Sequence, residues 1–164
     1  MAHVWFCSDL HFGHKGIEKF RGQTEAENRA RIIRDWQAVV TKRDHVYVLG
    51  DACFTMETVE SFAQLPGEKF LVRGNHDGLN TTVYLKYFKE VYGLLKYKEF
   101  WLSHAPIHPD ELRGRHNLHG HVHFGTLPDT RYFNVCPENL WKSKYQRCLI
   151  NLDEIRNEIT KTSN

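Results

Sequence analysis

The sequence predicts a single α/β domain that begins with parallel strands and continues with mixed strands. In the first half of the chain, short apolar and β-branched runs alternate with helical patterns, an order typical of parallel strands joined by helical crossovers. In the second half, strand-like runs follow one another with only short turns, so we expect antiparallel or mixed pairing there. A chain of 164 residues can form one core, so we expect one domain over residues 1–164.

The first half contains three strand-like runs, at residues 4–8, 46–49 and 69–72. After the first run, Thr24 and Glu27 have the spacing of a capping box. A helix up to about Thr41 is then indicated by apolar residues at helical spacing, namely Ile32, Ile33, Trp36, Val39 and Val40. Thr55 can cap a second helix, whose buried face would consist of Met56, Val59, Phe62 and Ala63. A third helix is expected near residues 81–88.

The second half contains further strand-like runs at residues 91–97, 100–103, 118–121, 132–135 and 148–151. Asp153 can cap a terminal helix that buries Ile155 and Ile159. The polar stretches 106–115 and 137–144 are interpreted as loops near a functional site.

Composition excludes few functions. The chain has 22 Lys and Arg against 20 Asp and Glu, a net charge of +2, which demands neither a nucleic-acid nor a membrane partner. Its four cysteines show no CxxC spacing and are interpreted as reduced thiols. No apolar run approaches the roughly 18 residues of a membrane span, so we expect a cytoplasmic protein. The 11 histidines are the unusual count, and many of them follow strand-like runs.

Side chains suited to metal binding follow five strand-like runs. The blocks are Asp9-Leu-His11, Gly50-Asp51, Gly74-Asn-His-Asp77, Ser103-His104 and His119-Gly-His-Val-His123. Ligands of open sheets with flanking helices bind at the carboxyl ends of strands, so these blocks should converge. Carboxylate, imidazole and amide groups suit hard or borderline divalent ions and leave positions for water and substrate. Two ions about 3.5–4 Å apart need a bridging anion, and Asp51 suits that role.

The five blocks, in this order, resemble the pattern of the calcineurin-like metallophosphoesterase superfamily, which is DxH, GD, GNH(D/E), an isolated H and GHxH. They extend from Asp9 to His123. The opening Asp-Leu-His-Phe-Gly-His and the short chain also resemble small single-domain members from bacteria and phages. The resemblance implies two mixed β-sheets packed as a sandwich with flanking helices.

The resemblance also implies roles for individual residues. One ion would be bound by Asp9, His11 and His123. The other would be bound by Asn75, His104 and His121, with Asp51 bridging the two. His76 would stand beside the leaving-group oxygen as general acid or transition-state stabiliser, and Asp77 would orient it through a hydrogen bond.

The implied activity is dinuclear-metal-dependent hydrolysis of a phosphomonoester or phosphodiester, with a metal-bridging hydroxide attacking phosphorus in line. We expect Mn²⁺ as the cofactor, with Fe, Zn, Ni and Co also compatible. A small nucleotide-like ester ranks above long nucleic acid, because a near-neutral chain offers no basic track. The alternatives are a nuclease and a catalytically silent scaffold of the same fold. A scaffold should have lost ligands such as Asn75 or His76, and neither is lost.

Other residues keep two interpretations. His14 is either a substrate contact or a solvated loop histidine. Four arginines either bind the phosphate or are surface charges: Arg21, Arg73, Arg113 and Arg115. His119 and Cys7 are interpreted as buried structural residues, and Trp101 and Trp141 as core or pocket wall.

Overall fold

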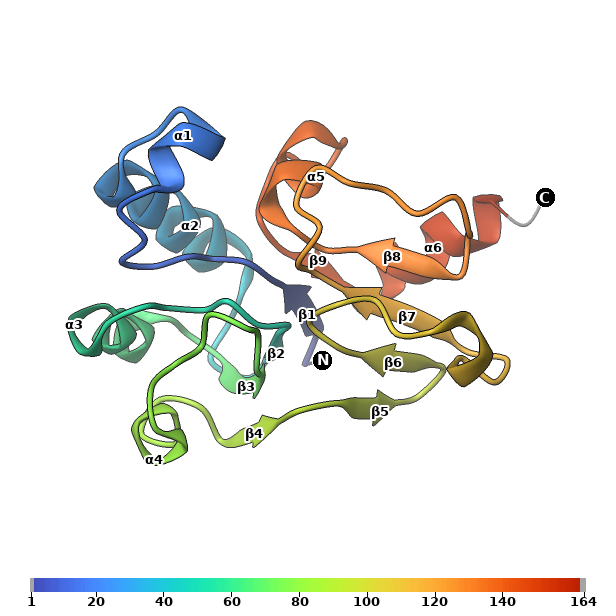
Figure 1. Cartoon of the computed structure of the whole chain (residues 1–164), viewed down its shortest axis with the longest axis horizontal. Coiled ribbons are helices and arrows are strands. Elements are labelled where there is room, and N and C mark those ends of the chain that lie inside the picture. The colour runs from blue at the N-terminus through green and yellow to red at the C-terminus, as the bar shows by residue number, and fades with distance from the viewer. Residues whose placement is uncertain (1, 163–164) are drawn as a thin grey trace.

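The computed structural model describes residues 2–162, which form two β-sheets with helices around them (Figure 1). The first sheet has five strands in the order β4-β3-β2-β1-β9. These strands are β1 (Val4–Cys7), β2 (His45–Val48), β3 (Glu68–Val72), β4 (Glu90–Tyr92) and β9 (Ile150–Asn151). Neighbours from β1 to β4 are parallel, whereas β9 is antiparallel to β1. The predicted parallel arrangement of the first half is therefore confirmed.

The longest crossover helix begins where the sequence predicts. α1 (Ile17–Arg21) is followed by α2 (Glu25–Val39). The Thr24 hydroxyl accepts the Glu27 N–H at 3.3 Å, and the Glu27 carboxylate accepts the Thr24 N–H at 2.8 Å, which completes the capping box. The predicted apolar stripe is confirmed, because Ile32, Trp36 and Val40 are buried.

The second helix differs from the prediction. α3 (Met56–Val59) passes directly into a 3₁₀ helix, η1 (Glu60–Gln64). Because a 3₁₀ helix has three residues per turn, Val59, Phe62 and Leu65 share the buried face. Met56 is 53% exposed and Ala63 is exposed, so their assignment to the core was wrong. α4 (Thr81–Tyr84) is a single turn, shorter than the predicted helix over 81–88.

The second sheet has four strands in the order β5-β6-β7-β8. They are β5 (Leu95–Tyr97), β6 (Phe100–Leu102), β7 (His116–His119) and β8 (Tyr132–Asn134). β5 pairs antiparallel with β6, while β6, β7 and β8 are parallel, so the predicted mixed pairing is confirmed. The single strand expected over 91–97 is wrong. The chain turns at Gly93-Leu94, and its two parts enter different sheets.

Of the two stretches interpreted as loops, one is confirmed and one is wrong. Residues 106–115 are irregular apart from the 3₁₀ turn η2 (Pro109–Glu111), whereas residues 137–142 form a helix, α5 (Pro137–Lys142). The terminal helix α6 (Leu152–Thr162) is capped by Asn151, whose side chain accepts the Glu154 N–H at 2.9 Å, rather than by Asp153.

Alternating side chains of the first sheet enter two separate cores. On one face, Cys7, Val48 and Leu71 pack against Ile32 and Trp36 of α2. On the other face, buried side chains of both sheets pack together, including Phe6, Tyr47, Phe70, Phe100 and Leu118. The two sheets therefore form a sandwich with helices on the outer face, as expected. No helix within residues 2–162 is long and apolar enough to cross a membrane.

Candidate dinuclear metal site

The predicted ligands converge because parallel strands deliver them to one edge. β1, β2 and β3 are parallel neighbours, and their carboxyl ends lead into Asp9, Asp51 and Asn75. The Asp9 N–H donates to the Gly50 carbonyl at 2.9 Å, which holds the first two loops together. β6 and β7 of the second sheet end at the same place, where the Gly120 N–H donates to the His104 carbonyl at 2.8 Å.

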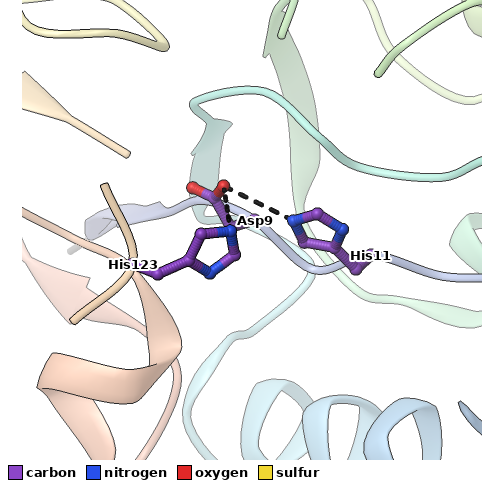
Figure 2. A group of neighbouring side chains, drawn as sticks. All are labelled: Asp9, His11 and His123. Atoms are coloured by element: carbon purple, nitrogen blue, oxygen red, sulfur yellow. Dashed lines mark ion pairs between the residues drawn. The ribbon is translucent and has the colours of Figure 1, made fainter. Parts of the chain in front are cut away.

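The first donor cluster consists of Asp9, His11 and His123. Asp9 Oδ1 lies 3.5 Å from His11 Nε2 and 3.6 Å from His123 Nε2. In Figure 2, dashed lines join the Asp9 carboxylate to one ring nitrogen of His11 and one ring nitrogen of His123. Such a convergence of one oxygen and two nitrogens matches the donor set of a divalent ion.

The second donor cluster consists of Asn75, His104 and His121. Asn75 Oδ1 lies 2.9 Å from His104 Nε2 and 3.1 Å from His121 Nδ1, and the two nitrogens are 3.1 Å apart. These distances are suited to an ion that shares all three donors. The sequence places these residues after three different strands, and only the fold brings them together.

Asp51 lies between the two clusters. Its Oδ2 is 3.7 Å from His11 Nε2, whereas its Oδ1 is 3.5 Å from His104 Nε2. One carboxylate oxygen therefore faces each cluster, which is the geometry that a bridging ligand requires.

Buried atoms without partners indicate that the first cluster fits a cation. Asp9 Oδ1 and both ring nitrogens of His11 are buried and have no hydrogen-bond partner within the described part of the chain. Buried polar atoms are normally paired, so the unpaired Asp9 Oδ1 and His11 Nε2, which lie 3.5 Å apart, need an explanation. A divalent ion at that point would satisfy the Asp9 oxygen and one His11 nitrogen.

Two histidines are held in the tautomer that a metal ligand needs. His104 Nδ1 lies 2.9 Å from the Leu49 carbonyl, so this nitrogen carries the proton and Nε2 has a free lone pair. His123 Nδ1 lies 3.0 Å from Glu138 Oε1, which leaves its Nε2 for the first cluster. The hydrogen bond to Glu138 is the main reason that the pKa of His123 is raised.

Polar neighbours keep the Asp9 carboxylate ionised. Burial on its own raises the pKa of Asp9, but the His11 imidazole 3.5 Å away, the nearby His104 imidazole and the hydrogen bond from the Ser8 hydroxyl outweigh it. The pKa of Asp9 is therefore well below its ordinary value. The Cys136 thiol, 3.1 Å from Asp9 Oδ2, stays protonated because burial and then the Asp9 charge raise its pKa.

The backbone at the site is in an uncommon conformation. Five candidate ligands have positive φ angles, with values of 51° at Asp9, 56° at His11, 50° at Asp51, 69° at His121 and 47° at His123. Residues other than glycine rarely adopt this region, and such strain collects at functional sites. Sequence periodicity does not predict this backbone conformation.

Gly120 is required at its position because two loops meet there. A Cβ atom on Gly120 would overlap Ser8 Oγ and Asp9 Oδ2. The close approach lets the His121 N–H donate to Asp9 Oδ2 at 2.9 Å, which links the first block to the last.

His76 lies at the open side of the site, whereas Asp77 lies beneath it. The His76 imidazole is 50% exposed, its Nε2 is 4.0 Å from Asp51 Oδ2, and its ring stacks on Phe54 at a centroid distance of 5.1 Å. Asp77 makes no hydrogen bond to His76, so the orienting bond that we expected is wrong. Its carboxylate instead accepts the N–H groups of Ala52 at 2.9 Å and Gly74 at 2.8 Å, which ties two ligand-bearing loops together.

Two arginines that we considered as substrate contacts have structural partners. Arg21 is buried and donates to Glu138 Oε1 at 2.7 Å, the Asp9 carbonyl at 2.6 Å and Asn28 Oδ1 at 2.8 Å. Arg73 donates to the carbonyls of Asp77 and Leu79, which lie within the loop that follows its own strand. Neither guanidinium is therefore a free surface charge. Their assignment as substrate contacts stays a prediction.

Glu138 is the residue of the site that the sequence did not indicate. It lies 15 positions from His123 in the chain, in a stretch expected to be a loop, and is 3% exposed on α5. Burial raises the pKa of Glu138, but the interactions with His123 and Arg21 lower it by more. The net pKa is below its ordinary value, so the carboxylate is ionised. No local motif signals this pairing.

His14 lies beside the first donor cluster. Its ring stacks on the Phe54 ring at a centroid distance of 4.7 Å, and its centroid is 5.3 Å from that of the His11 ring. It is therefore not a solvated loop histidine. His119 and Cys7 are buried, as expected of structural residues. Trp141 packs against the first core and also lines a pocket, so both of its interpretations apply.

The chain is similar in sequence to phage and archaeal proteins. It is 36% identical over 85 residues to Gene 66 protein of Mycobacterium phage L5, covering 48% of this chain and 41% of the phage protein. The match to Gene 66 protein of phage D29 also spans 41% of that protein, so the chain spans about two fifths of the length of these phage relatives. It is 28% identical over 144 residues to an uncharacterised protein of Methanocaldococcus jannaschii, covering 82% of this chain and 77% of the other.

Two solved structures resemble this fold. A protein of unknown function from Aquifex aeolicus has a TM-score of 0.73 at 26% identity, with 99% of this chain and 100% of the other covered. The Pseudomonas putida nuclease MPE has a TM-score of 0.51 at 19% identity, with 73% and 61% covered, a likeness that shows the fold alone. The sequence model of calcineurin-like phosphoesterases matches residues 2–161, nearly the whole chain. With the sandwich fold and the paired donor clusters, this match makes the chain a member of the calcineurin-like phosphoesterase family.

Proposed function

We propose that the protein is a dinuclear-metal-dependent phosphoesterase that acts on a small nucleotide-like phosphate ester. The observation that carries the proposal is the position of Asp51, with one oxygen toward His11 and the other toward His104. Two bound divalent ions, with Mn²⁺ as our first choice, would supply Lewis-acid charge for the phosphoryl oxygens and lower the pKa of the attacking water.

The chain's own residues orient that chemistry. His104 and His123 are fixed in their tautomers by the Leu49 carbonyl and Glu138, so they need no reorganisation to act as ligands. The Asp51 carboxylate accepts a hydrogen bond from the backbone N–H of His76 at 2.9 Å, which fixes its orientation. An in-line attack on phosphorus places the leaving group on the side opposite the nucleophile.

His76 is positioned to protonate the leaving-group oxygen. Its imidazole is half-exposed and packed against Phe54, so it can reach a substrate without leaving its place. His14 is a second candidate contact, because it stacks on the same Phe54 ring. Burial, followed by the His11 imidazole, lowers the pKa of His14, so the ring is neutral at pH 7 and offers one N–H donor.

Hydrolysis of chromogenic phosphomonoesters and phosphodiesters by chelator-treated, Mn²⁺-reloaded protein tests the proposal, with Asp51→Asn as the control. We expect metal-dependent turnover that Asp51→Asn abolishes together with metal occupancy. The ester hydrolysed faster would define the subclass. Unchanged activity of Asp51→Asn would refute the bridging role.

Two alternatives have their own outcomes. A protein that binds no metal and hydrolyses neither ester would be a scaffold, although the complete donor set argues against that function. The Pseudomonas putida neighbour is a nuclease, so single-stranded oligonucleotide is included as a third substrate. Cleavage of that substrate with no turnover of the small esters would favour a nuclease.

A further inference from the structure

A cavity of about 340 Å³ lies beside the candidate metal site and is lined by aromatic and cationic side chains. Its volume is within the range of small-molecule sites. Its walls come from α1, α2, α5 and the loop after β7, and include Phe20, Arg31, Phe124, Glu138, Trp141 and Lys142. None of its aromatic residues is a candidate metal ligand or catalytic residue of the site described above.

The cavity shares two walls with the surroundings of His123. The Phe20 ring is nearly parallel to the His123 imidazole, with an interplanar angle of 14° and a centroid distance of 6.4 Å. Glu138 Oε1 lies 3.0 Å from His123 Nδ1 and also lines the cavity. The cavity therefore adjoins the first donor cluster at His123.

The aromatic walls are unusually exposed. Phe20 is 60% exposed and Phe124 is 49% exposed. Trp141 is fixed by a 2.7 Å hydrogen bond from its Nε1 to Asp35 Oδ2. Exposed rings around one cavity offer stacking surfaces for a planar ligand.

The cations of the cavity are not neutralised. The Arg31 guanidinium lies 3.9 Å from the centre of the Trp141 ring, and Lys142 Nζ lies 4.7 Å from the centre of the Phe124 ring. Neither group forms a hydrogen bond or ion pair with a side chain within residues 2–162. By contrast, Arg21 and Glu138 neutralise each other at 2.7 Å. The cavity therefore combines stacking surfaces with free positive charge.

We propose that this aromatic–cationic pocket binds the nucleobase of a nucleotide whose scissile phosphate lies at the metal site, an inference that rests on the proposed function. The exposed rings stack on the base, and Arg31 and Lys142 donate to the base acceptors or to a neighbouring phosphate. Every base has an aromatic face, so the pocket accepts either a mononucleotide or the terminal base of a single strand.

The test is calorimetric binding to metal-loaded protein that carries His76→Ala, because this variant is expected to keep its metal while turnover falls, which separates recognition from hydrolysis. The probes are adenosine 5′-monophosphate and ribose 5-phosphate, which differ only in the base. We expect the nucleotide to bind roughly 5- to 150-fold more tightly, the range for one stacked base. The Phe20→Ala/Phe124→Ala double variant should lose that preference, whereas Leu94→Ala, an equally exposed apolar residue at 49%, should keep it. Thermal denaturation confirms that each variant is folded.

The charges are tested in the same way. Arg31→Gln and Lys142→Gln should each weaken binding of the nucleotide, whereas Lys86→Gln, at an exposed lysine just after α4 that does not line the cavity, should not. The proposal that the pocket binds the nucleobase would be refuted by equal affinity for the two probes. It would also be refuted by a double variant that binds the nucleotide as tightly as the wild type. A single-stranded oligoadenylate identifies the source of the base. Tighter, strongly salt-dependent binding indicates a strand end, and weaker binding indicates a mononucleotide.

Failure of the pocket and failure of the proposed function give different results. Metal-dependent hydrolysis without any preference for the base would reject the pocket and retain the phosphoesterase. Base-dependent binding by a metal-loaded protein that hydrolyses no ester would retain the pocket and reject the phosphoesterase.

Discussion

Replacing Glu138 with Gln tests whether a residue remote in sequence tunes one metal-binding cluster. Glu138 accepts from His123 Nδ1 at 3.0 Å and from Arg21 Nε at 2.7 Å while 3% exposed, so water does not compete for either bond. Gln keeps the volume and one acceptor oxygen but removes the charge that makes His123 a more basic ligand. Loss of such a partner typically weakens metal binding about 10- to 100-fold, or about 1.4–2.7 kcal/mol.

Glu138→Ala is a less specific change. It would leave the Arg21 guanidinium buried without its anion, which costs roughly 3–5 kcal/mol of folding stability. A loss of metal binding in that variant could then reflect unfolding. Glu138→Gln also removes the negative charge, but its amide oxygen can still accept from Arg21, so the loss of folding stability is smaller than in Glu138→Ala.

Competition with a fluorescent chelator measures the two metal affinities of wild type and Glu138→Gln. We expect only the ion bound by Asp9, His11 and His123 to bind more weakly, because Glu138 does not contact the second cluster. Glu57→Gln, an exposed change on α3, is the matched control. If Glu138→Gln is folded and binds both ions with wild-type affinity, the orienting role of Glu138 is refuted.

Three further predictions concern other parts of the molecule. His76→Ala should lower turnover by roughly 10²- to 10⁴-fold while metal content, measured by elemental analysis, stays near two ions; loss of metal would instead make His76 a ligand. Gly120→Ala should lower metal affinity, because the added methyl group would displace Asp9 or Ser8, and equilibrium dialysis should detect it; unchanged binding would show that the two loops can separate at no cost. Burial raises the pKa of Asp44, but hydrogen bonds from His3 and Thr41 outweigh it and hold the pKa below the ordinary value of 3.8. The resulting stability is present above that value and is lost as pH falls through the folded-state pKa, so the difference in melting temperature between wild type and Asp44→Asn should shrink below about pH 4; a constant difference would contradict this.

Local patterns in the sequence were sufficient for much of the fold. The Thr24–Glu27 capping box and the apolar stripe of α2 depend on residues a few positions apart, so they can be recognised without knowledge of the rest of the chain. The same holds for the strand runs that end in Asp9, Asp51 and Asn75. Strand ends of a parallel sheet meet at one edge, which is why the ligand blocks could be expected to converge.

Only the tertiary structure decided how those ligands are held. Arg21 and Glu138 are separated by 117 positions, and no periodicity connects them. Asp77 follows His76 in the chain, yet its carboxylate turns away to Ala52 and Gly74, because buried N–H groups there need an acceptor. The left-handed backbone at Asp9 and His121 likewise follows from the close contact of two loops.

The sequence by itself therefore determined which side chains meet at the sheet edge, since strand order and polarity bring the motif blocks together. It did not determine the contacts that hold those side chains in place, such as the Arg21–Glu138 ion pair. These contacts join segments far apart in the chain and depend on how both sheets and α5 pack. The proposed nucleobase pocket likewise depends on the tertiary structure, because α1, α2 and α5 each supply part of its wall.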